Sequence, residues 1–265
     1  MTEQVPPEPV TPEAPVGTRA LPPVPALGQP FGERPDGAAI RVSVARSDPA
    51  ATRSFDLPRR QPAVVLDLLL AIQRQRDPSL AFRYSCRVAT CGTCTVRVDG
   101  LPVLACQAIV AEDASAIRIE PLAGLPVVRD LVVDQAPFFE RWARVEPFAP
   151  AIAAAAAPAV VPPGSDERRA IDPTLDCISC GACFSACGVA GDGRRFLGPA
   201  ALNRAMTLVG DSRDGRPSGH AEVAFGPGGI DDCHSIGACT AVCPKGLDPA
   251  GAIRRLRRWR VAGHA

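Results

Sequence analysis

Residues 83–106 read Arg-Tyr-Ser-Cys-Arg-Val-Ala-Thr-Cys-Gly-Thr-Cys-Thr-Val-Arg-Val-Asp-Gly-Leu-Pro-Val-Leu-Ala-Cys. Cys86, Cys91 and Cys94 follow the spacing C-x4-C-x2-C, and Cys106 comes after a further eleven residues. This pattern is typical of a [2Fe–2S] site, where one loop wraps the cluster with three thiolates and a separate strand brings the fourth. A zinc site is the alternative, but zinc more often uses two separated C-x2-C pairs. We therefore expect these four cysteines to bind a [2Fe–2S] cluster.

The segments around this motif predict a small sheet crossed by one helix. Asp99-Gly100 suits the type I′ turn of a β-hairpin. Apolar patterning predicts strands at residues 40–44, 53–57, 95–98, 102–105 and 116–119, and a helix at residues 63–73. Together these elements predict a plant-type ferredoxin (β-grasp) domain over residues 38–146.

Two more cysteine runs lie beyond residue 164. The first has the spacing C-x2-C-x2-C-x3-C, and the second holds three cysteines and ends in Cys-Pro. They resemble the half-motifs of two-cluster ferredoxins, in which the fourth cysteine of each run binds the other cluster. By that rule a [4Fe–4S] cluster takes Cys177, Cys180, Cys183 and Cys243. The cysteines that remain are Cys187, Cys233 and Cys239.

The second of these runs has an isoleucine, Ile236, where a middle cysteine would complete the motif. Isoleucine cannot bind iron, so the corner that it faces is expected to be vacant. Three thiolates with a vacant corner favour a [3Fe–4S] cluster, and the alternative is a fourth, labile iron held by water. All eleven cysteines are then assigned, as four, four and three.

Composition sets the remaining expectations about organisation. Residues 1–37 hold ten of the 29 prolines and predict a disordered tail, and the Ala/Pro-rich residues 147–164 predict a linker. Helices are expected from Pro199 and from Asp248-Pro249 onward, which makes residues 165–265 a helical, bacterial-ferredoxin-like domain and the whole chain α+β.

The charge and the first residues bear on partners and location. A formal net charge of +1 gives no field that would attract nucleic acid. The chain starts without the basic and apolar regions of a secretion signal, so we expect it to stay in the cytosol. No apolar run reaches the roughly 20 residues that span a bilayer, so attachment to a membrane is expected to come from another subunit.

Residues 38–262 resemble a known family well beyond the cysteines. The matching stretches are Arg83-Tyr-Ser-Cys-Arg, residues 121–134, residues 196–202, Asp211-Ser-Arg-Asp, and residues 233–249. They identify the chain as similar to the iron–sulfur subunits of succinate dehydrogenase and fumarate reductase, the succinate:quinone oxidoreductases.

The resemblance implies an electron relay. In that family a flavoprotein subunit with covalently bound FAD oxidises succinate. The electrons then pass singly through the [2Fe–2S], [4Fe–4S] and [3Fe–4S] clusters to quinone at a membrane anchor, which in some members carries haem b. The iron–sulfur subunit has no catalytic residue of its own, and it lies peripherally on the cytoplasmic face of the inner membrane, held by its partners.

One loop departs from the family pattern. After the fourth cysteine of the second run the family typically has a proline and then tryptophans that contribute to the quinone pocket, whereas Cys187 is followed here by Gly-Val-Ala-Gly-Asp-Gly-Arg-Arg-Phe. This departure leaves three interpretations open: a succinate dehydrogenase subunit, the same relay in a fumarate reductase, or a soluble dicarboxylate oxidoreductase with a non-quinone acceptor. A zinc-stabilised interaction module is an alternative from a different class.

Histidines and arginines supply the last candidates. His234 follows Cys233 and is a candidate quinone-side residue by the resemblance, with a hydrogen-bonded loop histidine as the plainer interpretation. His220 lies in a Gly- and Arg-rich stretch and is expected to be solvated. The arginines at positions 254, 255, 257, 258 and 260 predict a solvated helix face, or else a surface for a membrane or a partner.

Overall fold

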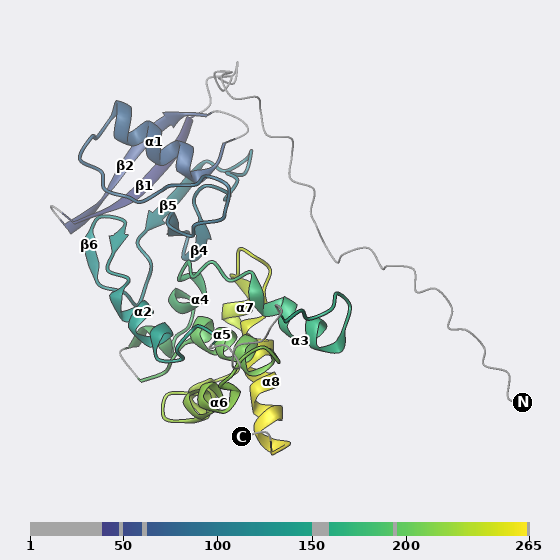
Figure 1. The fold of residues 1–265 in the computed structure, drawn as a ribbon. Coiled ribbons are helices and arrows are strands. Elements are labelled where there is room, and N and C mark those ends of the chain that lie inside the picture. The colour runs from purple at the N-terminus through teal and green to yellow at the C-terminus, as the bar shows by residue number, and fades with distance from the viewer. Residues whose placement is uncertain (1–38, 48–49, 60–62, 150–158, 193–194, 264–265) are drawn as a thin grey trace, which may run out of the picture.

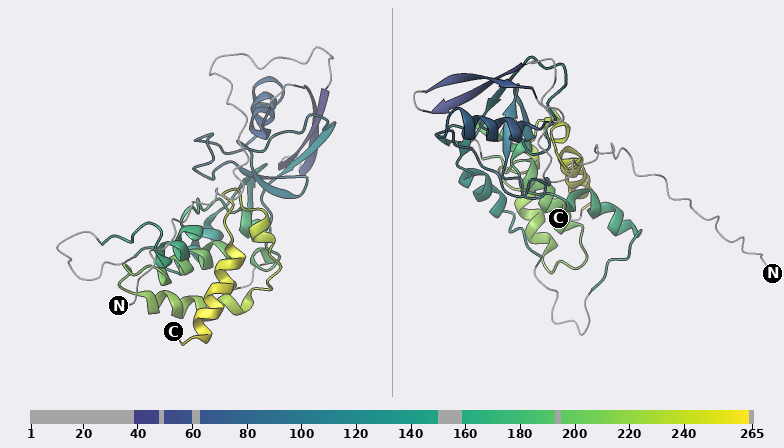
Figure 2. Two further views of the ribbon diagram at one scale, coloured as in Figure 1. Left: turned by 90° about the vertical axis from the view of Figure 1, so that its right-hand side faces the viewer. Right: turned by 90° about the horizontal axis from the view of Figure 1, so that it is seen from above.

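The structure is a computed structural model, and it describes residues 39–47, 50–59, 63–149, 159–192 and 195–263. The predicted tail, residues 1–37, lies outside the described residues, as do residues 150–158 of the predicted linker. The described chain forms a sheet lobe and a helical lobe (Figure 1). Figure 2 shows the same two lobes from two further sides. The prediction of an α+β chain with these two parts is confirmed.

The sheet lobe is built on five strands in the order β2-β1-β5-β3-β4. Strands β1 and β5 pair in parallel at the centre, and the other pairs are antiparallel. Alternating burial along β1 places Ile40, Val42 and Val44 in the core. All five strands were predicted, and their bounds are β1 Ala39–Ser47, β2 Ala50–Pro58, β3 Thr95–Val98, β4 Leu101–Leu104 and β5 Ala116–Glu120.

The turn between β3 and β4 has the backbone angles expected of the predicted type I′ turn. Asp99 and Gly100 have φ angles of 49° and 85°, and positive values at both positions are what a type I′ turn requires. This turn sets the pairing of Thr95 with Leu104, which places the strand that starts beside Cys94 opposite the strand that leads to Cys106.

Helix α1, Val65–Gln75, packs on the sheet as predicted. Its first turn is closed by Asp67, whose carboxylate accepts the backbone N–H of Val64 at 3.0 Å. Leu66, Leu69 and Ile72 face the core, because residues three and four apart share one side of a helix. This burial holds α1 on the sheet.

A strap of chain, residues 121–149, follows the sheet and leads to the helical lobe. It contains the hairpin β6 Val127–Arg129 and β7 Val132–Val133, and then helix α2, Ala136–Ala143. Phe138 and Val145 of the strap pack into the core of the helical lobe. The sequence did not predict these elements, which are short and have little periodicity.

The helical lobe surrounds α5, Pro199–Val209, which is buried along nearly its whole length. Its start after Gly198 was predicted, and so was the start of α8, where Asp248 accepts the backbone N–H of Gly251 at 2.8 Å. The other elements of this lobe are α3 Asp166–Leu175, α4 Ala182–Ser185, η1 Ala190–Asp192, α6 Pro217–Phe225, η2 Ile230–Asp232 and α7 Ala238–Ala241, followed by α8 Pro249–Val261. None of the helices in the described ranges combines the length and the apolar character needed to cross a bilayer.

The expectation that His220 is solvated is wrong. His220 lies in α6 and is fully buried. Its Nδ1 is 2.9 Å from the carbonyl oxygen of Val145, and its Nε2 is 3.0 Å from a carboxylate oxygen of the buried Asp214. The side chain therefore fastens α6 to the end of the strap, a contact that spans 75 residues of sequence and leaves no local pattern.

Candidate metal centres

The first cysteine group lies in the loop between α1 and β3, with Cys106 just beyond β4. The loop backbone takes left-handed conformations at Arg87, Ala89 and Gly92. This coiling turns backbone donors inward, so that the N–H groups of Thr90 and Cys91 both lie 3.3 Å from the sulfur of Cys86. Such N–H groups directed at sulfur are what a bound iron–sulfur cluster needs.

Two thiols of this group have opposite pKa shifts. A hydrogen bond with the Thr93 side chain, followed by backbone donors, lowers the pKa of Cys91 to about 6. Burial, with repulsion from Cys106 and Cys91 as later contributions, raises the pKa of Cys94 to about 12. These mutual effects place the thiols close together, in the set that the spacing predicted.

The second group comes together from two distant parts of the chain. Cys177, Cys180 and Cys183 line one cavity, and Cys243-Pro244-Lys245 line the same cavity. Burial is the main cause that raises the pKa of Cys180 to about 11, and charge repulsion from Cys177 and Cys243 adds to it. The structure thus brings together the four cysteines that the crossed-ligand rule selects.

The third group lines a separate cavity. Cys187 approaches it just after the end of α4, Cys233 directly after η2, and Cys239 from helix α7. Burial, with repulsion from Cys187 and Cys233 among the lesser causes, raises the pKa of Cys239. His234 and Ile236 line the same cavity.

The loops of the second and third groups share one backbone conformation. Ser179 and Ser235, each two residues after the first cysteine of its loop, have φ angles of 51° and 59°. Gly181 and Gly237 have φ angles of 78° and 84°, and each precedes a four-residue helix. In this correspondence Ile236 occupies the position of Cys180. Cys180 is buried, but the Ile236 side chain is 78% exposed.

The donor sets fit iron–sulfur clusters. Burial strongly raises the pKa of the Cys183 thiol and raises that of Cys177. Such thiols need bound metal to hold them as thiolates. Within the described ranges no three His, Cys, Asp or Glu side chains converge on one point as ligands of a single metal ion. A cluster does not need such convergence, because each of its irons binds thiolates at its own corner.

The loops of the three groups touch one another in sequence order. A Cβ atom added at Gly92 would lie 2.7 Å from Cβ and 2.8 Å from Cα of Cys180, so the first and second loops are in van der Waals contact. The hydroxyl of Thr95, which donates to the Gly92 carbonyl at 2.7 Å, also interacts with the Cys180 thiol. Repulsion from Cys239 is among the effects on Cys183, which links the second and third groups.

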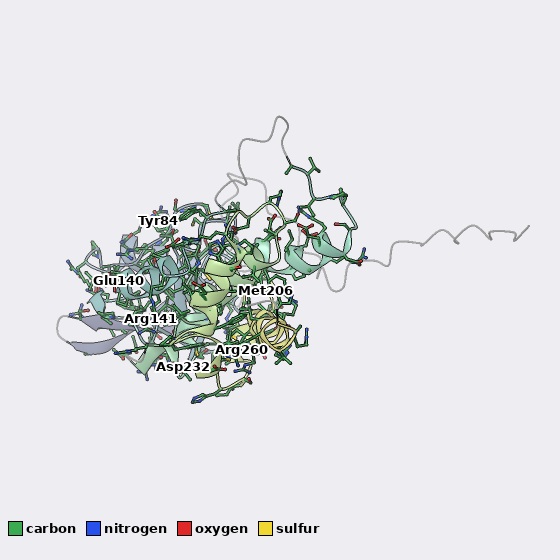
Figure 3. All side chains as sticks on the ribbon, turned by 60° about the horizontal axis from the view of Figure 1, so that its bottom comes forward. Tyr84, Glu140, Arg141, Met206, Asp232 and Arg260 are labelled. Atoms are coloured by element: carbon green, nitrogen blue, oxygen red, sulfur yellow. The ribbon has the colours of Figure 1, made fainter. Side chains whose placement is uncertain are left out.

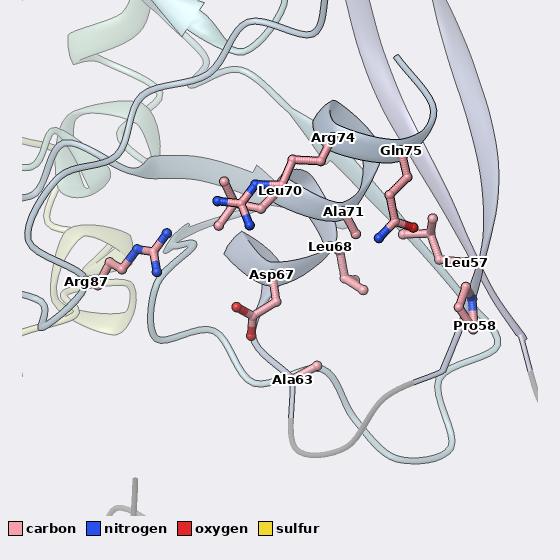
Figure 4. Close-up of a pocket in the computed structure, with 10 residues that line it drawn as sticks. All are labelled: Leu57, Pro58, Ala63, Asp67, Leu68, Leu70, Ala71, Arg74, Gln75 and Arg87. Atoms are coloured by element: carbon pink, nitrogen blue, oxygen red, sulfur yellow. The ribbon is translucent and has the colours of Figure 1, made fainter. Parts of the chain in front are cut away.

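A larger cavity lies in the sheet lobe. It has a volume of about 220 Å³ and lies between α1 and the end of β2. Figure 4 shows Arg74 and Arg87 reaching toward the same region beside Asp67. The described residues that line it include no cysteine, but Arg87 directly follows Cys86, so the cavity borders the first cysteine loop.

The arginines near the C-terminus do not form one solvated face. Arg254 pairs with Asp248 at 3.2 Å, and Arg260 pairs with Asp231 at 2.7 Å. Arg257 donates to the loop that carries Cys233. Arg254 is exposed, as a solvated face predicts, whereas Arg257 and Arg260 are only partly exposed and bind residues near Cys233. Sequence reasoning missed these two contacts because the partners lie in another segment of the chain. A membrane or partner surface on this helix stays a prediction.

Two protein-family models match parts of this chain. Residues 40–140 match the 2Fe-2S iron-sulfur cluster binding domain, and residues 174–247 match the 4Fe-4S dicluster domain. The first match contains the first cysteine group, and the second contains the other two.

Whole-length relatives are also similar to this chain. The fumarate reductase iron-sulfur subunit of Haemophilus influenzae is 34% identical over 82% of this chain and 91% of its own length. The succinate dehydrogenase iron-sulfur subunit of Paracoccus denitrificans is 36% identical over 86% of this chain and 91% of its own length. A chain of the Mycobacterium smegmatis Sdh1 complex in the apo form has the same fold, with a TM-score of 0.73, 24% identity, and coverage of 86% of this chain and 97% of that one.

Proposed function

This chain belongs to the iron–sulfur subunits of succinate dehydrogenase and fumarate reductase, and on that premise we propose that it is the electron-transfer subunit of a succinate dehydrogenase. In this role it relays single electrons from the FAD of a flavoprotein subunit to quinone at a membrane anchor. The dicarboxylate chemistry belongs to the flavoprotein, and this chain contributes no catalytic residue.

The proposed ligands follow the three cysteine groups. A [2Fe–2S] cluster is held by Cys86, Cys91, Cys94 and Cys106. A [4Fe–4S] cluster is held by Cys177, Cys180, Cys183 and Cys243, and a [3Fe–4S] cluster by Cys187, Cys233 and Cys239. The two cavities lined by the second and third groups support this division. The exposed isoleucine at position 236 supports a vacant iron corner in the third.

The observation that carries the relay is the contact between successive cysteine loops. Gly92 lies against Cys180, and Cys183 and Cys239 are near enough to influence each other's charge. When bound, each cluster takes up and releases one electron. The chain's own residues fix the distances between these centres, hold the thiolates, and direct backbone N–H groups at sulfur.

The membrane end of the proposed relay is the third group. His234 is exposed and lines its cavity, as a quinone-side residue would. The protein as a whole would lie at the cytoplasmic face of the inner membrane, where the anchor subunits hold it peripherally. Among the described residues that line this cavity there is no tryptophan, so quinone contacts here would differ from the family pattern.

We also propose the domain division that the sequence predicted, with a disordered tail at 1–37, a [2Fe–2S] domain at 38–146, a linker at 147–164 and a helical domain at 165–265. The two hydrophobic cores support two domains. The strap that carries α2 belongs by sequence to the first domain and packs on the second.

Low-temperature EPR on anaerobically purified protein tests the proposal. We expect a [3Fe–4S] signal in the oxidised protein that disappears on reduction with dithionite, while a [2Fe–2S] signal appears. Protein with full iron content but no [3Fe–4S] signal would contradict the three-cluster relay. A colourless zinc protein would contradict electron transfer altogether.

A second candidate function keeps the relay and changes the complex. The altered loop after Cys187 permits a fumarate reductase or a soluble dicarboxylate oxidoreductase with a non-quinone acceptor. Relatives carry both names, and nothing favours fumarate reduction over succinate oxidation. Fractionation separates the soluble case, because a subunit held by an anchor sediments with membranes.

A further inference from the structure

Arg257 of α8 binds the loop that supplies Cys233. Its Nη2 donates to the carbonyl oxygens of Ile230 and Cys233, both at 2.7 Å. Its Nη1 donates to the hydroxyl of Ser235, also at 2.7 Å. One planar guanidinium thus joins three acceptors on either side of a proposed cluster ligand, which is a geometry that the point charge of a lysine cannot reproduce.

The bound loop has a strained backbone that points a donor at sulfur. Ser235 is not glycine, yet its φ angle is 59°, a left-handed conformation that is unfavourable for a residue with a Cβ atom. In this conformation the backbone N–H of Ser235 lies 3.4 Å from the sulfur of Cys233. The Arg257 contact to the Ser235 hydroxyl holds the residue in that position.

Neighbouring arginines of α8 differ from Arg257 in their contacts. Arg260, labelled in Figure 3, pairs with Asp231 in the turn before Cys233 through two short contacts, 2.7 and 2.9 Å. Arg258 is exposed, and in the described part of the chain it has no hydrogen-bond or ion-pair partner. The helix therefore offers an arginine at the cluster loop and, one residue away, an arginine in solvent.

We propose that Arg257 is a positioning residue that raises the reduction potential of the centre held by Cys187, Cys233 and Cys239. Reduction adds negative charge to that centre. A half-buried positive charge beside Cys233 favours the reduced state, and so does a fixed N–H group directed at its sulfur, because both charge and hydrogen bonds to sulfur tune cluster potentials. The inference rests on the proposed [3Fe–4S] assignment.

The test is an EPR-monitored potential titration of the [3Fe–4S] signal in the holoprotein for wild type, Arg257→Gln, Arg257→Lys and Arg258→Gln. We expect Arg257→Gln to lower the midpoint potential of the [3Fe–4S] couple. The expected shift corresponds to a tenfold change in the oxidised-to-reduced ratio at a fixed potential, which is about 59 mV for one electron. Arg257→Lys keeps the charge but not the three contacts, so its midpoint should fall between those of Arg257→Gln and wild type. Arg258→Gln should stay near wild type.

Each other outcome overturns the inference in a distinct way. Equal shifts of the midpoint potential in Arg257→Gln and Arg258→Gln would show that the effect comes from the total charge of the helix and not from Arg257 in particular. If Arg257→Lys has the wild-type midpoint potential, the three hydrogen bonds of Arg257 do not contribute, and only its charge matters. Loss of the signal in both Arg257 variants would assign the residue to cluster assembly instead. If the wild-type protein itself has no [3Fe–4S] signal, the proposed three-cluster relay fails, and this inference fails with it.

Discussion

At the residue scale, we expect single side chains to decide which cluster each loop is able to hold. The loops around Cys180 and Ile236 share the same left-handed positions, yet one presents a buried thiol and the other an exposed aliphatic side chain. In the proposed assignment, the difference between four and three protein ligands is one side chain between flanking residues of matching φ angles.

Replacement of Ile236 with cysteine should supply the missing ligand. We expect Ile236→Cys to convert the third centre to [4Fe–4S], because the backbone at this position matches that at Cys180. The oxidised [3Fe–4S] EPR signal should disappear, and a second [4Fe–4S] signal should appear on reduction. Ile236→Val is the control and should retain the original signal. Persistence of that signal in the cysteine variant would show that the side chain does not face the vacant corner.

Asp77 shows how a single carboxylate stabilises the sheet lobe. It pairs with the buried Arg46 and with Arg53, each at 3.0 Å. A hydrogen bond from the Ser79 hydroxyl is the main cause that lowers its pKa below the ordinary 3.8, and the arginines contribute less. A carboxylate whose pKa is lowered by folding stabilises the protein above its unfolded pKa and loses this effect as the pH falls through the folded value.

We therefore expect Asp77→Asn to reduce the free energy of unfolding by about 1–3 kcal/mol at pH 7. The difference from wild type should shrink as the pH falls below 3.8, the ordinary carboxyl value. Urea denaturation at several pH values measures both effects. Asp56→Asn is the control, because the Asp56–Arg41 pair is well exposed and should change little. A difference that does not depend on pH would assign the effect to packing.

At the scale of elements, contacts between loops and helices position the cysteines. Gly92 permits the first cysteine loop to lie against Cys180, and α6 is tied to the strap by His220. Both contacts join segments that are far apart in sequence.

Gly92→Ala should separate the first two loops. The added Cβ would come within 2.8 Å of the Cys180 backbone, and the φ angle of +69° is unfavourable for alanine. We expect weaker magnetic coupling between the reduced [2Fe–2S] and [4Fe–4S] clusters in EPR and slower reduction of the second. Gly100→Ala is the matched control, since its φ angle is +85° but no atom lies within 4 Å. Equal effects in both variants would show that backbone strain alone is responsible.

His220→Ala should destabilise the helical lobe. It leaves a cavity and deprives both the Val145 carbonyl and Asp214 of a partner, which together should cost about 2–4 kcal/mol. Thermal unfolding of the iron-loaded protein provides the measurement. His234→Ala is the control, because that side chain is exposed. If the two variants melt alike, the buried contacts of His220 contribute little.

Sequence reasoning succeeded where the signal is local. The Asp99-Gly100 turn, the alternation in β1, and the cap at Asp248 are each written within a few neighbouring residues, and the structure has all three. The cysteine grouping also follows from spacing, and the structure brings the same sets together, although iron binding by them stays a prediction. His220 and Arg257 were not recognised, because their partners lie 75 and 24 residues away and no periodicity records such contacts.

At the scale of the whole molecule, each lobe has its own apolar core, and we expect the two lobes to depend on iron to different degrees. The sheet lobe has a continuous apolar core beneath α1. In the helical lobe the second and third cysteine loops end in helices of four residues, α4 and α7, which are too short to be stable without support.

Removal of iron should therefore loosen the helical lobe first. After chelation under anaerobic, reducing conditions we expect residues 177–187 and 233–247 to lose protection from hydrogen exchange. Strands β1 and β5 should keep their protection, because apolar side chains rather than thiolates hold them. Uniform loss of protection across both lobes would show that the sheet also requires a cluster to fold.

The cavity shared by Cys177, Cys180, Cys183 and Cys243 has a consequence for how the protein is made. During synthesis, three of its sulfurs leave the ribosome long before the fourth. The site cannot close until residue 243 and the start of α8 have emerged, and by then Cys187, Cys233 and Cys239 are present as well. With the proposed ligands, iron would enter only after all seven of these cysteines have emerged, and we expect both centres of the helical lobe to mature together, after translation rather than during it.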